Sequence, residues 1–336
     1  MDPEGLGLCA DVIEDLCSTR LGSPAERRGT NIIWRRPGGR PTLVLGHFDT
    51  VWPPGTIVSF PFSLEEGVAR GPGVFDMKAG IVQGISAIAS STAPVTLLLT
   101  SDEEIGSTES RALIEEEAKL SQAVLVLEPS HRGALKVSRK GLGKWRVEVT
   151  GRAAHAGLDP ERGVNAALEL ARQFDAIAAL ARADLGTTVT ITTLGGGSAE
   201  NVVPERAWCT VDARMWTAEE AQRLDRQMAM LDPILADTSL TVTGGINRPP
   251  MPREACESLF SRLRSIGYQL DATAVGGMSD GNLTASLGIP TLDGLGAVGG
   301  GAHARDEHVI LEEMPRRATM VADLLESLAR RPLELA

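Results

Sequence analysis

Three apolar segments that lead directly into acidic or histidine side chains restrict most strongly what this chain can fold into. They are Leu43–His47, Val95–Thr100 and Ala123–Glu128. Short apolar runs bounded by turn residues are typical of strands that are buried on both faces. Helical patterns separate the three runs, and strands that alternate with helices predict a parallel sheet. Open sheets of this kind bind ligands at the carboxyl ends of their strands, where these polar residues lie.

The end of the first strand carries His47, one intervening residue and then Asp49. Residues two apart on an extended segment point to the same side, so Asp49 can accept the second ring N–H of His47. That hydrogen bond would fix which ring nitrogen faces a metal ion. The alternative is a surface histidine at a strand end, followed by an aspartate that caps a helix.

Further acids follow at comparable positions along the chain. Asp76 lies in a glycine- and proline-containing approach to a helix, Arg70–Gly80, where its alternative role is a helix N-cap. Glu103 and Glu104 follow the second strand, and adjacent acids beside an apolar strand are costly unless water or cations compensate them. Their alternative is a solvated loop or an acidic first helical turn. Glu128 closes the third strand.

The candidate metal ligands are two histidines and three acids without a thiolate: His47, Asp76, Glu104, Glu128 and His303. This mixture of imidazole and carboxylate suits zinc, cobalt or manganese. Five ligands are one more than a closed tetrahedral site needs, so either some are not ligands or two ions share the aspartate. Glu103 is left over beside a candidate ligand, which is the position that a general base for a metal-activated water requires.

The hydrophobic pattern changes between about residues 143 and 249. Four segments alternate between apolar and polar residues: Trp145–Val149, Thr187–Leu194, Ala207–Met215 and Leu240–Thr243. Two helical patterns lie among them, at Asn165–Ala183 and Ala218–Leu231. This combination predicts a separate α+β layer with one solvated face. The proline-rich Arg248–Pro252 is expected to lead back to the first domain.

Charge and cysteine content exclude several classes of protein. The net charge of −11 and the pI of about 5.1 argue against nucleic acid or an anionic membrane as the main partner. The four cysteines are scattered without a CxxC pair, which argues against a disulfide framework and a thiolate zinc site. The N-terminus has no signal-peptide pattern and no segment approaches the length of a membrane span, so we expect a cytoplasmic protein without a membrane partner.

Characteristic motifs occur in order along nearly the whole chain: HFDTV, GPGVFDMKAG, TSDEEIGS, EPS, GRAAHAG, ENVVPE, VDAR and GAHARDE. With them the chain resembles the M20 family of dizinc metallopeptidases and amidohydrolases, in particular its glutamate carboxypeptidase (carboxypeptidase G2-like) branch. The resemblance implies an α/β metal-binding domain whose mixed, mainly parallel sheet has helices on both faces, formed by residues 1–142 and 250–336. Residues 143–249 would form an inserted α+β lid and dimerisation domain.

The resemblance also implies how two zinc ions, or cobalt or manganese ions in their place, are held. His47 and Glu128 would bind one ion, Glu104 and His303 the other, and Asp76 would bridge them. The peptide bond after the bridging aspartate is often cis in the family.

Other residues take roles in catalysis and substrate binding from the same resemblance. Glu103 would shuttle protons, Asp49 would orient a metal-binding histidine, and His155 would reach the active site of the partner subunit to stabilise the oxyanion. Asn201 and Arg214 would contact the substrate carboxylate.

Each of the lid residues has a simpler alternative. His155 is flanked by small residues and could be an ordinary loop histidine. Arg214 could form a surface ion pair with Asp212, and such pairs are common and weak. Asn201 precedes Val-Val-Pro and could be a turn residue.

The predicted activity is hydrolysis of an amide or peptide bond next to a free carboxylate, which releases a glutamate-like C-terminal amino acid from an N-acyl or peptidyl conjugate. One alternative is an N-acyl-amino-acid deacylase of the acetylornithine or succinyl-diaminopimelate type, because it too cuts an amide beside a carboxylate. A second alternative is a non-catalytic binding protein that kept the fold. The expected partners are a small N-acyl amino acid or short peptide and a second copy of the chain, bound through the lid domain.

Overall fold

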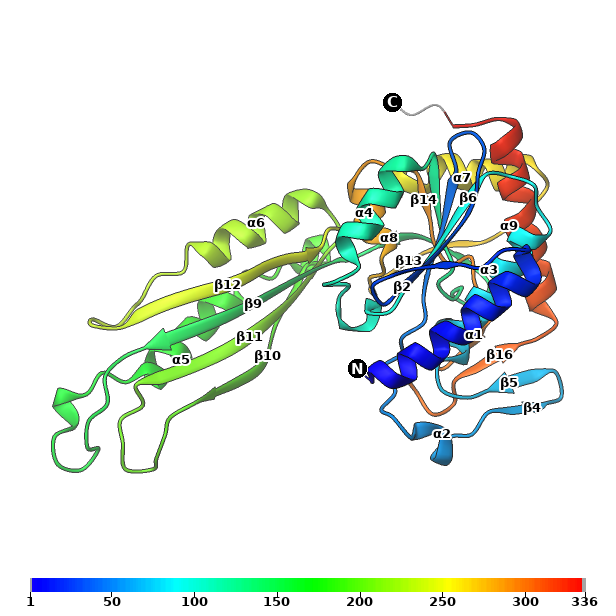
Figure 1. Ribbon diagram of the computed structural model, residues 1–336. Coiled ribbons are helices and arrows are strands. Elements are labelled where there is room, and N and C mark those ends of the chain that lie inside the picture. Colours follow the sequence, from blue (N-terminus) through cyan, green and yellow to red (C-terminus); the bar gives the residue numbers. More distant parts are fainter. Residues whose placement is uncertain (1, 334–336) are drawn as a thin grey trace. The chain divides into compact units, whose positions relative to one another are not determined.

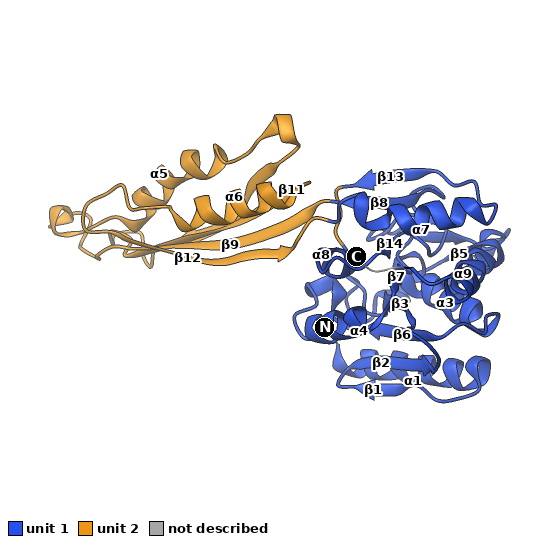
Figure 2. Ribbon diagram, turned by 90° about the horizontal axis from the view of Figure 1, so that it is seen from above, with its two compact units in different colours: residues 1–139, 251–275, 279–336 blue, residues 140–250, 276–278 orange. Residues whose placement is uncertain are grey.

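The computed structural model describes residues 2–333 (Figure 1), so residues 1 and 334–336 of the predicted domains lie outside it. The chain divides into two compact units (Figure 2). Unit 1 comprises Met1–Arg139, Met251–Val275 and Ser279–Ala336, and unit 2 comprises Lys140–Pro250 and Gly276–Met278.

A six-stranded sheet forms the centre of unit 1. Its order is β1 (Glu26–Arg28), β2 (Asn31–Arg36), β6 (Val95–Thr100), β3 (Thr42–His47), β7 (Ala123–Val126) and β14 (Thr291–Leu292). The pairs β6–β3, β3–β7 and β7–β14 are parallel, whereas β1–β2 and β2–β6 are antiparallel. The predicted mixed, mainly parallel sheet is therefore confirmed, and the three apolar segments are its β3, β6 and β7.

Helices cover both faces of this sheet, because alternate residues of each strand point to opposite sides. Leu97 and Leu99 of β6 pack in the core cluster that also contains α1 (Pro3–Leu21), α3 (Ala79–Ala89), α7 (Glu254–Ser265) and α9 (Glu313–Arg330). Leu98 packs on the other side with α4 (Arg111–Leu120) and α8 (Gly281–Ser286). No helix within residues 2–333 has both the length and the apolar character that a membrane crossing requires.

The N-terminal helix begins at Pro3, because local sequence caps it there. The Asp2 side chain accepts a hydrogen bond from the N–H of Glu4 at 3.2 Å, and Pro3 is the first helical residue. Proline suits that position because its missing N–H has no helical partner there. The helix ends where Gly22 adopts a φ of 80° and donates its N–H to the carbonyl of Ser18.

Two smaller sheets in unit 1 join segments that lie far apart in the sequence. One has the order β15 (Gly299–Gly300), β16 (His308–Ile310), β5 (Val68–Arg70) and β4 (Ser63–Glu65). The other pairs β8 (Leu135–Arg139) with β13 (Ala272–Val275) in parallel. Strands β4 and β5 form a hairpin, in which Glu66 and Gly67 turn the chain with positive φ values of 50° and 79°.

Unit 2 is an antiparallel sheet with two helices packed on it. The strand order is β10 (Thr188–Gly196), β11 (Arg206–Met215), β9 (Gly141–Thr150) and β12 (Ser239–Arg248), and the helices are α5 (Ala166–Ala178) and α6 (Ala218–Ala229). Alternate residues of β9 and β11 are buried against both helices, as the alternating pattern predicted. Each unit thus has its own hydrophobic core.

The core of unit 1 can be tested at Leu97, which is fully buried within β6. Leu97→Ala removes buried methyl groups and leaves a cavity, so we expect the free energy of unfolding to fall by about 2–5 kcal/mol. Urea titration measures this change. The control Leu8→Ala, at a helix position that is 63% exposed, should stay within about 0.5 kcal/mol of the wild type. Equal losses in the two variants would contradict the assignment of the core.

Candidate metal centre

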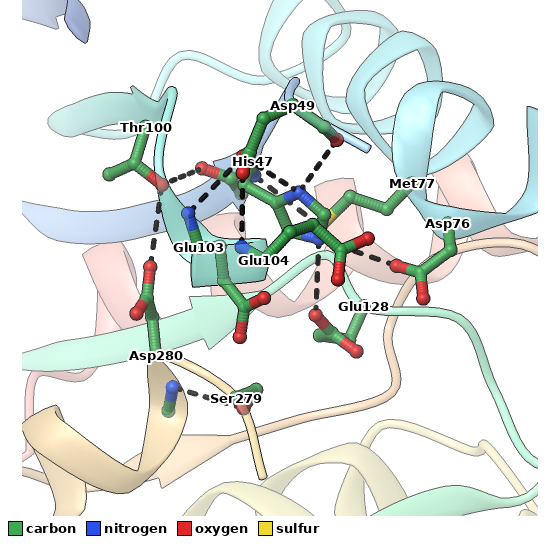
Figure 3. Close-up of polar contacts among 12 residues, drawn as sticks. His47, Asp49, Asp76, Met77, Thr100, Glu103, Glu104, Glu128, Ser279 and Asp280 are labelled. Carbon is green, nitrogen blue, oxygen red and sulfur yellow. Dashed lines mark hydrogen bonds and ion pairs between the residues drawn. The ribbon is translucent and has the colours of Figure 1, made fainter. Parts of the chain in front are cut away.

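His47 lies at the carboxyl end of β3 with its ring almost completely buried. Its Nδ1 lies 3.2 Å from the carbonyl oxygen and 3.3 Å from the carboxylate Oδ1 of Asp49. Its Nε2 lies 3.3 Å from Asp76 Oδ1 and 3.5 Å from Glu128 Oε1 (Figure 3). One ring nitrogen therefore faces Asp49, and the other faces two carboxylates.

Asp76 lies between the two histidines. Its Oδ1 is next to His47, and its Oδ2 lies 3.2 Å from Nε2 of His303. The same Nε2 of His303 lies 3.4 Å from Glu104 Oε1. Each histidine thus has one oxygen of Asp76 and one glutamate beside it. Possible ligand atoms of His47, Asp76 and Glu104 also lie within 4.8 Å of one another.

The backbone of the segment Val74–Lys78 is kinked, because Asp76 and Met77 have non-helical φ/ψ values. The peptide bond Asp76–Met77 is cis, as the resemblance implied. Asp76 does not cap the following helix, because α3 begins at Ala79. Gly73, at a φ of 74°, has no room for a side chain, since a Cβ would lie 2.4 Å from Cγ2 of Thr50. The loop therefore packs directly against the segment that follows β3.

Asp49 also organises the acids that follow β6. Its carboxylate accepts hydrogen bonds from the N–H groups of Glu103 at 3.2 Å and of Glu104 at 3.0 Å. These residues open a short 3₁₀ turn, Glu103–Ile105, and the side chain of Glu103 is buried. The alternative of a solvated loop is therefore wrong for Glu103, whereas the alternative of an acidic first helical turn agrees with this 3₁₀ turn.

The donor atoms of this cluster fit divalent cations. Within residues 2–333, Asp76 Oδ1 and Glu104 Oε1 are buried and have no hydrogen-bond partner apart from their contacts with His47 and His303. Buried carboxylate oxygens without a donor are costly unless a cation compensates them. Imidazole nitrogens and carboxylate oxygens are ligands of zinc, cobalt and manganese. The cluster consequently has the composition and the unsatisfied acceptors of a metal site.

The acids of this cluster favour the protonated forms of both histidines. Burial alone would lower the pKa of His47, but Asp49, Asp76 and Glu128 outweigh it and raise that pKa well above its ordinary value. Asp76 and Glu104 raise the pKa of His303 to about 10. Because metal ligation needs neutral imidazoles, metal binding should release these protons.

The pKa values of the two buried glutamates, Glu103 and Glu128, are shifted in opposite directions. Burial raises the pKa of Glu103 well above its ordinary value, and the nearby acids Asp280 and Glu128 add to this effect. Burial and Asp76 would also raise the pKa of Glu128, but Arg139 and other cations prevail and lower it. Neighbouring acids with divergent pKa values are typical of sites where one acid exchanges protons and another stays ionised.

Arg139 is a residue of the site that the sequence did not reveal. It is buried and donates to Glu128 Oε2 at 3.1 Å, and to both oxygens of Asp293 at 2.7 Å and 3.0 Å. Asp293 lies 154 positions further along the chain, so no local pattern could have paired the two. Asp280 is also buried, and it accepts hydrogen bonds from Ser107 and Thr100.

The predicted lid residues all belong to unit 2. His155 is exposed, and its Nδ1 accepts the N–H groups of Gly157 at 3.1 Å and Leu158 at 3.2 Å. Its segment pairs with the segment of Asn201 through a bridge to Val202. The structure thus brings the His155 and Asn201 segments together within unit 2.

The third predicted lid residue, Arg214, forms an ion pair. Its guanidinium donates to both carboxylate oxygens of Asp212, at 2.8 Å and 3.0 Å. This is the pairing that the simpler alternative described, and it holds the guanidinium in one orientation.

Comparisons with known proteins agree with this geometry. The family model for peptidase family M20/M25/M40 matches residues 43–327. The chain is 30% identical to carboxypeptidase G2 of Pseudomonas sp. (strain RS-16), over 97% of this chain and 85% of that protein. It is 28% identical to succinyl-diaminopimelate desuccinylase of Dechloromonas aromatica (strain RCB), over 97% and 94%.

A solved structure has the same fold. An M20 family metallo-carboxypeptidase from Sulfolobus solfataricus superposes with a TM-score of 0.72 at 16% identity, over 97% of this chain and 95% of that chain.

Because the pKa of His303 is raised in the folded state, the free energy of unfolding of the metal-free protein should depend on pH. Its pKa is about 10 in the folded state and about 6.5 in the unfolded state. The stabilisation from protonated His303 is therefore fully present below pH 6.5 and is lost as the pH rises through about 10. We expect the stability difference between the wild type and His303→Gln to shrink over this window, as measured by urea unfolding with a chelator present.

A matched control for this pH series is His131→Gln, since His131 is exposed and lies outside the cluster. The free energy of unfolding of this variant should change with pH in the same way as that of the wild type. A difference between wild type and His303→Gln that stays constant from pH 6.5 to 10 would contradict the electrostatic coupling of His303 to Asp76 and Glu104.

Proposed function

The chain belongs to peptidase family M20/M25/M40 and is a metal-dependent amide hydrolase, and we propose that it releases a glutamate-like C-terminal amino acid from an N-acyl or peptidyl conjugate. The observation that carries this proposal is that the two oxygens of one partly buried aspartate, Asp76, each lie beside a histidine, with Glu103 buried in the same cluster. The similarity to carboxypeptidase G2 supports the choice of a carboxyl-terminal amino acid as product.

The proposed centre holds two zinc ions, or cobalt or manganese ions in their place. His47 and Glu128 would bind one ion, His303 and Glu104 the other, and Asp76 would bridge them. The distances of 3.2–3.5 Å between these side chains support this division. Bound there, divalent cations would supply Lewis acidity, which polarises a scissile carbonyl and acidifies water.

Glu103 is the proposed proton carrier. It would take a proton from the attacking water and give it to the leaving amine. Its burial and its raised pKa support this role, because a carboxylate whose pKa is raised is a stronger base than an ordinary glutamate. Asp49 would keep Nδ1 of His47 occupied, so that Nε2 remains directed at the centre.

The roles proposed for unit 2 rest on the family resemblance. His155 from the partner subunit of a homodimer would donate a hydrogen bond to the oxyanion, and Asn201 and Arg214 would bind the substrate carboxylate. The planar guanidinium of Arg214 suits this task, since its fork can bind both oxygens of a carboxylate. A cytoplasmic location belongs to the same proposal.

A second candidate activity is N-acyl-amino-acid deacylation of the acetylornithine or succinyl-diaminopimelate type. The similarity to succinyl-diaminopimelate desuccinylases favours it, and the same cluster would serve both reactions because both cut an amide near a carboxylate. The remaining alternative, a binding protein without catalysis, is not favoured, because the chain is a hydrolase by family.

A substrate screen separates the two enzymatic candidates. Zinc-loaded protein would be incubated with N-acyl and peptidyl conjugates of glutamate and aspartate, and with N-acetylornithine and N-succinyl-diaminopimelate, while amine release is measured. We expect the highest kcat/KM for the glutamyl conjugates, complete loss with a chelator and recovery with zinc. Turnover of N-succinyl-diaminopimelate alone would favour the deacylase, and no turnover of any substrate would contradict both candidates.

The role of Glu103 is tested by Glu103→Gln, which keeps the shape of the side chain but cannot carry the proton. We expect kcat to fall by about 10²–10⁴-fold while the zinc content stays at the wild-type level. Steady-state kinetics and elemental analysis of the same sample measure both quantities. The control is Glu109→Gln, an exposed acid in the same segment, which should keep wild-type kcat. Wild-type turnover in Glu103→Gln would remove Glu103 as the proton carrier.

A further inference from the structure

Glu307 is a fully buried carboxylate four positions after His303, and it is neither a candidate metal ligand nor the proposed proton carrier. Its Oε1 accepts the N–H groups of Phe75 at 2.9 Å and Asp76 at 3.0 Å. Its Oε2 accepts the N–H of Gly73 at 2.9 Å and the indole N–H of Trp52 at 2.8 Å. An ionised carboxylate can accept about four hydrogen bonds, so these donors use its full capacity.

These bonds join three segments that carry candidate metal ligands. Trp52 lies five positions after His47, Gly73–Asp76 is the loop that presents Asp76, and Glu307 itself follows the turn of His303. The segments are separated by up to 255 positions in the sequence, yet one side chain contacts all of them. Hydrogen bonds to a charged acceptor are also stronger than those between neutral groups.

The turn that presents His303 needs such an anchor. Gly301 and His303 both have left-handed φ values, 74° and 64°, and the His303 side chain is 51% exposed. Left-handed backbone at a residue other than glycine is unfavourable, and persists where surrounding contacts hold it. The turn closes through backbone bonds from Ala304 to Gly301 and from Glu307 to Ala304. Glu307 is the buried end of this turn.

We infer that Glu307 is a positioning residue of the metal centre, which fixes the Asp76 loop against the His303 turn and so sets the spacing of the two ligands. The inference rests on the proposed metal centre, since it assigns Glu307 no contact with metal or substrate. Groups that orient metal ligands typically change metal affinity by about 10–100-fold when they are replaced.

The test is Glu307→Gln. Glutamine keeps the size of the side chain, but its NH₂ group cannot accept hydrogen bonds. Two of the four N–H donors would therefore lose their acceptor. We expect the folded variant to bind zinc about 10–100-fold more weakly than the wild type, as measured by competition with a chromophoric chelator. Circular dichroism on the same samples verifies that the variant is folded. Wild-type zinc affinity in folded Glu307→Gln would overturn the inference.

The matched control is Glu169→Gln in unit 2. Glu169 is also fully buried and accepts two backbone N–H groups, from Ile234 at 3.0 Å and Leu235 at 2.7 Å. The variant Glu169→Gln should have a lower free energy of unfolding, as Glu307→Gln should, but it should bind zinc as tightly as the wild type. A purely structural role for Glu307 would make the two variants alike in both measurements, which would also overturn the inference.

A milder variant covers the case in which Glu307→Gln does not fold. Trp52→Phe removes one of the four donors and leaves the other three, so we expect a smaller loss of zinc affinity in the same direction. Unchanged affinity in Trp52→Phe would then overturn the inference. If the wild-type protein itself binds no zinc, the proposed metal centre is contradicted. If the wild type binds zinc and the Glu307 and Trp52 variants bind it equally well, only the inference about Glu307 is contradicted.

Discussion

The burial of several carboxylates around two imidazoles is the constraint on which the rest of the structure depends. Like charges in a buried cluster repel one another and lose hydration, so the surrounding protein must hold them in place and compensate them. The central sheet provides the rigidity, because helices bury both of its faces and β3 and β7 end at the cluster. Arg139 compensates Glu128 on one side, and the two histidines lie against the carboxylates on the other.

Much of this arrangement follows from local sequence. The apolar runs of β3, β6 and β7 and the alternating strands of unit 2 were predicted because burial on two faces or on one face leaves a direct pattern in the sequence. The carboxyl ends of neighbouring parallel strands share one edge of a sheet. That geometry explains why Nε2 of His47, at the end of β3, lies 3.5 Å from Oε1 of Glu128, which follows β7.

The rest could not be predicted because it depends on pairing between distant segments. Strands β13, β15 and β16 have two to four residues each, and partners elsewhere in the chain stabilise them rather than any pattern of their own. The hydrogen bonds of Arg139 and Glu307 likewise join distant parts of the chain. Arg139 and Asp293 are 154 positions apart, and Glu307 and Trp52 are 255 positions apart. Motifs indicate which residues carry the chemistry, whereas the residues that position them become visible only in the folded chain.

The central claim is that two cations share the carboxylate of Asp76, one beside His47 and one beside His303. Anomalous scattering from crystals grown with saturating zinc tests it most directly, because it locates and counts the ions. The account predicts two zinc peaks on either side of Asp76, within bonding distance of the two histidines. An empty cluster, or a single ion that leaves one of these histidines without a metal bond at saturating zinc, would contradict it.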